Sequence, residues 1–491
     1  EWIMSFDYGK NGGFTNGNGQ TGWNQNGASP FKGEDEFNAR SRVHLQLHAV
    51  ASEALSGTVF FEIGDIVWGK ASTGGALGAD GTIVEVKNAY LDWMLPGSNT
   101  KVRMGIQSLR LPSFTTGSNI LGDDVAGIVA SHKFNDNVSV TGMWLRPFND
   151  NYAGETGGIR QNYMDNMDIG ALVVPLSFDG VKVTPWGMYA GIGPNTFGNG
   201  DFSSLKAGFT AQGTSWQGVQ AGLLPAGGAI RKDGSPVGKR LHDYGNAVWL
   251  GLTGEVTEFD PFRLAWDFNY GSVSYDDSHY NRQGWLGNLL FEYKTGWGIP
   301  GVYGWYSSGD DGNPANGSER MPHLSVINTH NNFSHFAFNG SPYLARERLL
   351  GNQMSGTWGI GARLKDVSFI DDLRHTLRLN YIGGTNSPTM AKRYMTPGGN
   401  TDYISFADGP NSQAWGTGPL YMTTNDSAVE IGLTTEYQVY ENLKVHMEAA
   451  YLATLLDKSR SVWGTSVMNG KGGSDDMRDP WSLNLGVVYT F

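Results

Sequence analysis

The sequence contains no cysteine and no long apolar run. Because none of the 491 residues is cysteine, disulfides and zinc–thiolate sites are excluded. A transmembrane helix is excluded as well, since it needs about 18 or more consecutive apolar residues and the chain has no such stretch. Apolar residues make up only 39% of the chain, which is less than a water-soluble domain of this length normally uses for its core.

Glycine and aromatic residues are abundant instead, with 70 glycines and 12% aromatics. A β-barrel with a wet interior needs apolar side chains only on the strand faces that meet lipid. The mean hydropathy of −0.33 is therefore compatible with a membrane protein of this type. The formal net charge is −12, from 35 basic and 47 acidic residues, and it argues against nucleic acid as a partner.

Apolar and polar side chains alternate in stretches of about ten residues, the pattern of β-strands with two different faces. In residues 261–270, Phe262, Leu264 and Phe268 share one face and Arg263 and Asp267 share the other. Charges on the second face could not lie in a dry core without a heavy cost in free energy. A soluble β-sandwich would show the same alternation, but tryptophan and tyrosine recur at strand ends on the apolar face, as a membrane-interface girdle requires.

Short and long connections alternate along the chain. Short turns at residues 96–100 and 440–442, and a slightly longer one at residues 365–372, contrast with long connections at residues 191–243 and 308–355. This rhythm is typical of the periplasmic turns and extracellular loops of outer-membrane barrels. We therefore predict an all-β fold, a single transmembrane antiparallel β-barrel domain over residues 1–491.

The predicted strand count is about 18. Residues 1–8 form the first predicted strand and residues 481–491 the last. Two segments alternate least regularly, residues 163–178 and 298–307, and without them the count would be 16.

No motif predicts an enzyme. The GxGxxG match at residues 17–22 lies in a Gly/Asn-rich stretch without a following helix. His44 and His48 are four residues apart, about 13 Å on a strand, too far to share one metal ion. No nucleophile–base constellation is evident, so we predict no catalytic residues. Asp310 and Asp311 are calcium candidates through their oxygen ligands, although solvated loop acids are the simpler interpretation.

Basic residues dominate the polar strand faces. Rings of basic side chains favour anions in a pore, so the pattern raises the hypothesis of an anion preference. The alternative is that these charges pair with neighbouring acids and only keep the interior wet. The predicted pore-lining basic residues are Arg40, Arg42, His44, Lys101, Arg103, Arg363, Arg374, Arg378 and Lys444.

Three sequence stretches carry a family resemblance. They are the opening EWIMSFDYG at residues 1–9, KNAYLDW at residues 87–93 and the ending VVYTF at residues 487–491. With these features the chain resembles the general bacterial porins and, more closely, the outer-membrane homotrimeric porins of sulfate-reducing deltaproteobacteria. The C-terminal Phe491 resembles the signal by which the barrel-assembly machinery recognises its clients.

The resemblance implies a homotrimer, passive diffusion, no cofactor and an inward fold of the third external loop. That loop is residues 110–124 here and includes Asp123 and Asp124. In general porins, acids on this loop face a basic cluster on the barrel wall, for which the candidates include Arg42 and Arg103. The loop lacks the usual Pro-Glu-Phe-Gly-Gly-type sequence.

The predicted function is that of a porin in the bacterial outer membrane, through which small hydrophilic solutes and ions diffuse. Its surroundings would be outer-membrane lipid and lipopolysaccharide. The main alternative is a substrate-selective channel for an oxyanion such as sulfate. An outer-membrane barrel enzyme and a secreted β-sandwich adhesin are further alternatives, which the missing hydrolase motifs and the aromatic girdle disfavour.

Overall fold

The computed structural model describes most of the chain. The described residues are 1–10, 36–78, 81, 84–149, 155–156, 159–160, 164, 166–194, 196, 222–225, 229–235, 237, 241–324, 331–334, 336–338, 353–394, 421–457 and 479–491.

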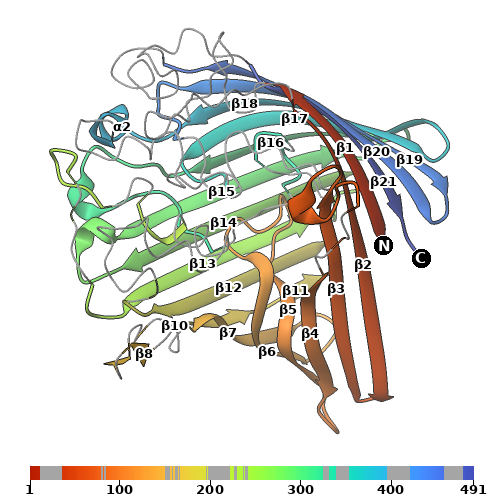
Figure 1. Cartoon of the computed structure of the whole chain (residues 1–491), viewed down its shortest axis with the longest axis horizontal. Helices are drawn as coiled ribbons and strands as arrows, with labels where there is room; N and C mark the ends of the chain where they lie inside the picture. The colour runs from red at the N-terminus through yellow and green to blue at the C-terminus, as the bar shows by residue number, and fades with distance from the viewer. Residues whose placement is uncertain are drawn as a thin grey trace.

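Antiparallel strands make up nearly all of the regular structure in these residues (Figure 1). The first seven strands are β1 (Trp2–Lys10), β2 (Glu36–Ser52), β3 (Leu55–Val67), β4 (Val84–Met94), β5 (Thr100–Arg110), β6 (Gly122–Lys133) and β7 (Ser139–Asn149). The next seven are β8 (Glu155–Thr156), β9 (Ile159–Arg160), β10 (Asn166–Val173), β11 (Leu176–Phe178), β12 (Val181–Ile192), β13 (Gly245–Val256) and β14 (Phe262–Ser274). The last seven are β15 (Arg282–Tyr293), β16 (Ile299–Ser307), β17 (Thr357–Ile370), β18 (Leu373–Gly384), β19 (Ser427–Tyr440), β20 (Leu443–Leu455) and β21 (Trp481–Tyr489).

Helices are few and short. Among the described residues they include the α-helix α2 (Pro388–Tyr394) and the 3-10 turns η1 (Ala71–Thr73), η3 (Ser278–Tyr280) and η4 (Pro314–Asn316). No helix in the described part of the chain has the length and hydrophobicity to span a bilayer.

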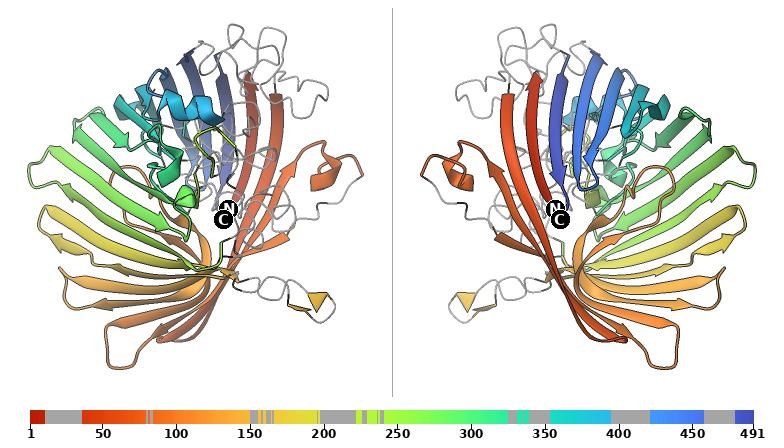
Figure 2. Two further views of the ribbon diagram at one scale, coloured as in Figure 1. Left: turned by 90° about the vertical axis from the view of Figure 1, so that its left-hand side faces the viewer. Right: turned by 90° about the vertical axis from the view of Figure 1, so that its right-hand side faces the viewer.

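The main sheet closes on itself. Strand β1 pairs antiparallel with β2 and also with the last strand β21, with Trp2 opposite both Val43 and Tyr489. The sheet contains 19 strands, but β10 and β11 both pair with β12 end to end. Around the barrel there are therefore 18 strand positions, which confirms the predicted count over the alternative of 16. The termini lie side by side at the rim of the short turns (Figures 1 and 2).

Two details of the predicted strands were wrong for physical reasons. Residues 163–178 were expected to be one strand, but Pro175 interrupts it between β10 and β11 because proline has no N–H to give to the ladder. Residues 365–372 were expected to be a turn, but β17 continues to Ile370. Register shifts after Leu364 and Val367 mark bulges that break the alternation there.

The outer face of the barrel is apolar, as the alternation predicts. Leu250, Phe268, Leu289 and Ile360 lie mid-strand with exposed side chains, and Asn269 of the intervening positions is buried. Exposed aromatic residues recur near strand ends, including Trp93, Tyr293, Tyr437 and Tyr489. This exterior matches the lipid-facing band and girdles of a transmembrane barrel.

Leu250 gives a direct test of the lipid-facing band. It lies in the middle of β13 with its side chain 54% exposed. We expect Leu250→Arg to destabilise the barrel in a bilayer by about 2–4 kcal/mol, because a charged side chain at the midplane loses its hydration. Reversible urea unfolding in lipid vesicles measures this. The matched control is Gln46→Arg, an exposed position in the middle of β2 on the opposite face, where an equal loss would contradict the assignment of faces.

The inner wall is not polar all the way round, which the expectation of a wet barrel interior did not include. Inward side chains of β6, β7, β10, β12–β16 and β18–β20 pack against residues from the long connections in one buried apolar cluster. Trp249, Tyr303 and Trp305 belong to the wall, and Leu223 and Phe333 come from the connections. The connections supply apolar side chains of their own, so this part of the wall can be apolar on both faces.

Candidate channel interior

The connection between β5 and β6, residues 111–121, folds into the barrel. It contains no charged residue, and it docks on β13–β15, strands that are not adjacent to its own. Asp267 of β14 is the anchor: its carboxylate accepts hydrogen bonds from Ser113 Oγ at 2.6 Å, from the Phe114 N–H at 3.0 Å and from Thr115 Oγ1. Asn288 of β15 also donates to Thr115 at 3.4 Å. We call residues 111–121 the β5–β6 loop.

This geometry agrees with the inward fold expected of the third external loop, but its chemistry differs from the expectation. Asp123 and Asp124 lie in β6 and not in the loop. Asp124 forms an ion pair with Lys87 at 3.0 Å and accepts from Asn88 at 2.9 Å. The acid at the docking site is Asp267 on the wall, and the loop contributes only hydroxyls, amides and carbonyls.

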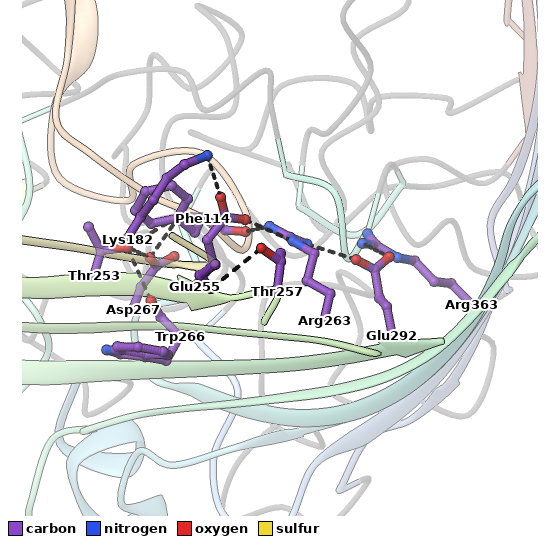
Figure 3. Close-up of polar contacts among 11 residues, drawn as sticks. Phe114, Lys182, Thr253, Glu255, Thr257, Arg263, Trp266, Asp267, Glu292 and Arg363 are labelled. Atoms are coloured by element: carbon purple, nitrogen blue, oxygen red, sulfur yellow. Dashed lines mark hydrogen bonds and ion pairs between the residues drawn. The ribbon is translucent and has the colours of Figure 1, made fainter. Parts of the chain in front are cut away.

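A row of alternating charges crosses the inner wall beside the docked loop (Figure 3). Glu255 pairs with Lys182 and with Arg263, both at 2.9 Å. Glu292 pairs with Arg263 and with Arg363, both at 2.7 Å. Arg263 also donates to the carbonyl of Phe114 in the β5–β6 loop at 2.8 Å. We call Lys182, Glu255, Arg263, Glu292 and Arg363 the ionic row.

Strand register explains how the ionic row forms. Lys182 lies opposite Glu255, and Arg263 lies opposite Glu292, so each pair is a direct cross-strand neighbour. Arg363 is two strands from Glu292, with Gly301 of β16 between them. A side chain on Gly301 would begin 3.0 Å from the Glu292 Cγ atom. Glycine at this position therefore leaves the space in which Glu292 and Arg363 meet.

A second segment, residues 331–334 and 336–338, is anchored inside the barrel. We call it the second inward segment. Glu430 of β19 accepts hydrogen bonds from Ser334 Oγ at 2.9 Å and from the Phe336 N–H at 3.1 Å. The carbonyl of Asn332 accepts from Arg363 at 3.1 Å and from Arg378 at 3.2 Å. The ring of Phe333 stacks on Tyr303 of the wall, with 4.2 Å between ring centroids.

The predicted pore-lining basic residues fall into separate groups and not one ring. On β2, Arg42 pairs with Asp65 at 2.6 Å, and His44 contacts Glu62 at 2.9 Å. Beside them Arg40 lies 3.6 Å from Asp7. On β5, Lys101 and Arg103 share Asp92 of β4, at 3.0 and 2.7 Å.

The other predicted basic residues lie on β17–β20. Arg363 and Arg378 share the Asn332 carbonyl, Lys444 pairs with Glu436 at 2.9 Å, and Arg374 is exposed near the short-turn rim. Sequence reasoning did not identify Lys87, Lys182 or the bridging role of Arg263. The period-two alternation around Phe262 places Arg263 on the inner face, but nothing in the sequence indicates its partners.

Exposure differs systematically between the partners of several ion pairs. Side-chain exposure is 44% for Lys101 against 15% for Asp92, and 53% for Lys182 against 13% for Glu255. Lys87 and Glu62 differ in the same way, at 36% and 12%. Water therefore meets the cationic end of these pairs. Arg42 with Asp65 and Lys444 with Glu436 show the opposite order.

The calcium candidates lie in the connection between β16 and β17. Both oxygens of buried Asp310 accept hydrogen bonds, one from Ser318 and the Glu319 N–H and the other from Tyr421 at 2.7 Å. Asp311 accepts from the Asn313 N–H at 2.6 Å. These donors occupy oxygens that a cation would need. Over the described ranges, no group of three or more His, Asp or Glu side chains is placed to hold a metal ion.

Glu319 makes this connection sensitive to pH. Burial, reinforced by Asp310 and Asp311, raises the pKa of Glu319 from 4.5 to about 7. Between these values the folded connection keeps a proton that the unfolded chain releases, so its stabilisation is complete below pH 4.5 and is lost as the pH rises through about 7. We expect the protection factors for hydrogen exchange of residues 310–319, which remove the intrinsic pH dependence of amide exchange, to fall across that window. Glu319→Gln should abolish the change, and an unaltered pH profile in this variant would refute the assignment.

The closed antiparallel sheet, the apolar exterior and the charged inner wall together define a transmembrane β-barrel of the outer-membrane type. No family model matches the chain, and no curated protein matches it.

Solved structures with a similar architecture are outer-membrane channels of Pseudomonas. One is OpdK of Pseudomonas aeruginosa with vanillate, at 9% identity, covering 99% of this chain and 96% of that chain with a TM-score of 0.49. Others are a BenF-like porin of Pseudomonas fluorescens Pf-5 (10% identity, coverage 100% and 98%, TM-score 0.49) and OccK11 (OpdR) of P. aeruginosa (11%, 99% and 94%, 0.45). Identities and TM-scores this low do not indicate a shared substrate.

Proposed function

We propose that this chain is a porin of the bacterial outer membrane, through which small hydrophilic solutes and ions diffuse passively. The observation that carries the proposal is the water-exposed, ion-paired inner wall around Lys101, Arg103 and Lys87. Buried apolar side chains of β6, β7, β10, β12–β16 and β18–β20 pack against residues of the long connections, and among the described residues no strand from β1 to β5 contributes a buried side chain to that cluster. The proposed aqueous path therefore runs along the wall of β2–β5, eccentric to the barrel axis.

We also propose a modest anion preference. Charge pairing largely balances the wall, but water meets the cationic ends of the Lys101, Lys87 and Lys182 pairs. A permeating anion would approach these ammonium groups more closely than a cation would approach the carboxylates behind them. The greater exposure of the cationic partner in these ion pairs supports the preference. The excess of basic residues does not.

Planar-bilayer recording of the purified protein tests both statements. We expect stepwise ohmic conductance and, in a tenfold KCl gradient, a reversal potential on the anion side that moves toward zero in Lys101→Gln. The absence of any conductance, together with no swelling of proteoliposomes in small sugars, would exclude the porin. A block of chloride current by sulfate would favour the oxyanion-selective alternative, and a cation-side reversal potential would exclude the anion preference.

Assembly as a homotrimer and recognition by the barrel-assembly machinery belong to the same proposal. Phe491 is 64% exposed beyond β21, so its ring is accessible to a partner. Deleting Phe491 should lower the yield of folded barrel in the outer membrane. Chemical cross-linking in native membranes tests the trimer. A gel with no cross-linked band above the monomer would contradict it.

A further inference from the structure

Both inward segments are anchored by the same combination of groups. In each case a buried wall carboxylate accepts N–H and O–H groups of the segment: Asp267 for the β5–β6 loop and Glu430 for the second inward segment. In each case an arginine also donates to a main-chain carbonyl of the segment, Arg263 to Phe114 and Arg363 to Asn332. Each anchor thus fixes both the donors and an acceptor of its segment.

Glu292 connects the two anchors. Its Oε2 atom accepts from Arg263 and its Oε1 atom accepts from Arg363, both at 2.7 Å. The Glu292 side chain is 7% exposed, so little water is available to replace either arginine. Hydrogen-bonded charges in such a low-dielectric setting depend strongly on each other's positions. The line of contacts from the Phe114 carbonyl to the Asn332 carbonyl is therefore Arg263, Glu292 and Arg363 without interruption.

We propose that Glu292 couples the two inward segments, so that loosening one of them loosens the other. When the second inward segment leaves Arg363, that guanidinium loses an acceptor and turns further toward Glu292. The shared carboxylate then shifts away from Arg263, and the hold of Arg263 on the Phe114 carbonyl weakens. Glu292 acts as a positioning residue, and the two inward segments respond as one unit. The inference extends the proposed function, but its test needs no transport.

The absence of cysteine provides a clean reporter for the test. We place a single cysteine in the β5–β6 loop as Gly117→Cys, a half-buried position away from the Asp267 anchor. Its rate of reaction with an uncharged thiol reagent is measured in folded protein with and without Glu430→Gln, which weakens only the other segment. With Glu292 present we expect Glu430→Gln to raise the labelling rate about fivefold or more, a typical allosteric coupling. With Glu292→Gln also present, Glu430→Gln should have no further effect.

Three results would overturn the proposal. Glu430→Gln could leave the labelling rate unchanged, it could raise the rate equally with and without Glu292, or the control could raise the rate as much. The control is Glu62→Gln, another inner-wall acid whose partners are Arg42, His44 and Lys87. If Glu292→Gln does not fold, as judged by heat-modifiable gel migration, Arg363→Gln interrupts the same link while keeping a donor near the Asn332 carbonyl. Conductance plays no part, so failure here is separate from failure of the porin assignment.

Discussion

Replacing Asp267 with asparagine is expected to raise the single-channel conductance and the open-channel noise. The Asp267 carboxylate holds Ser113, the Phe114 N–H and Thr115 of the β5–β6 loop. Asparagine has one acceptor oxygen where aspartate has two, and it carries no charge. Hydrogen bonds to a charged group contribute about 1.5–3 kcal/mol each, so the loss of one or two would raise the undocked population of the loop on the order of a hundredfold.

A disulfide that restores the docked loop is the control for this prediction. Thr116 and Asn288 are in hydrogen-bond contact at 3.4 Å, and the chain has no other cysteine to interfere. We expect Asp267→Asn combined with Thr116→Cys and Asn288→Cys to conduct like the parent when oxidised and like Asp267→Asn when reduced. Equal conductance of the parent and Asp267→Asn would mean that the β5–β6 loop does not bound the permeation path.

The barrel was predictable because lipid contacts one face of each strand and water the other. Apolar and polar residues therefore alternate along the strand with a period of two. Every inner residue such as Asn269 is followed by an outer one such as Tyr270, and the alternation survives even where loops later cover the inner face. The prediction failed where local backbone features override this period. Pro175 removes a ladder donor, and the bulges beyond Leu364 place two residues opposite one.

The candidate site was predictable only in part, because alternation gives the face of a residue and not its partners. It placed Arg42, Arg103 and Arg363 on the polar face, but whether each meets an acid depends on register between strands that are distant in sequence. The β5–β6 loop was harder still. Its anchor Asp267 lies about 150 residues further along the chain, and its uncharged sequence has no complementary charge to indicate the docking site.

Replacing Arg282 with methionine is expected to loosen the connections above the barrel while leaving the strands closed. Arg282 begins β15 and is only 1% exposed. Its guanidinium donates to the carbonyls of Leu224, Arg320 and Met321 at 2.9–3.2 Å, so one side chain joins segments around residues 224 and 321. Methionine fills a similar volume but removes the guanidinium donors from these buried carbonyls, although the Met321 carbonyl still accepts a hydrogen bond from Ser355 Oγ at 3.1 Å. Each carbonyl that loses its donor costs about 1–3 kcal/mol before any compensation by water.

We therefore expect Arg282→Met to lower the stability of this assembly by on the order of 3–5 kcal/mol. Limited proteolysis should cut the long connections many times faster, while heat-modifiable gel migration continues to report a closed barrel. The matched control is Arg374→Met at an exposed position of β18, which should leave the proteolysis rate unchanged. If Arg282→Met abolished barrel closure instead, the connections would be part of the cooperative unit of the strands. Unchanged proteolysis would mean that water, and not Arg282, satisfies these carbonyls.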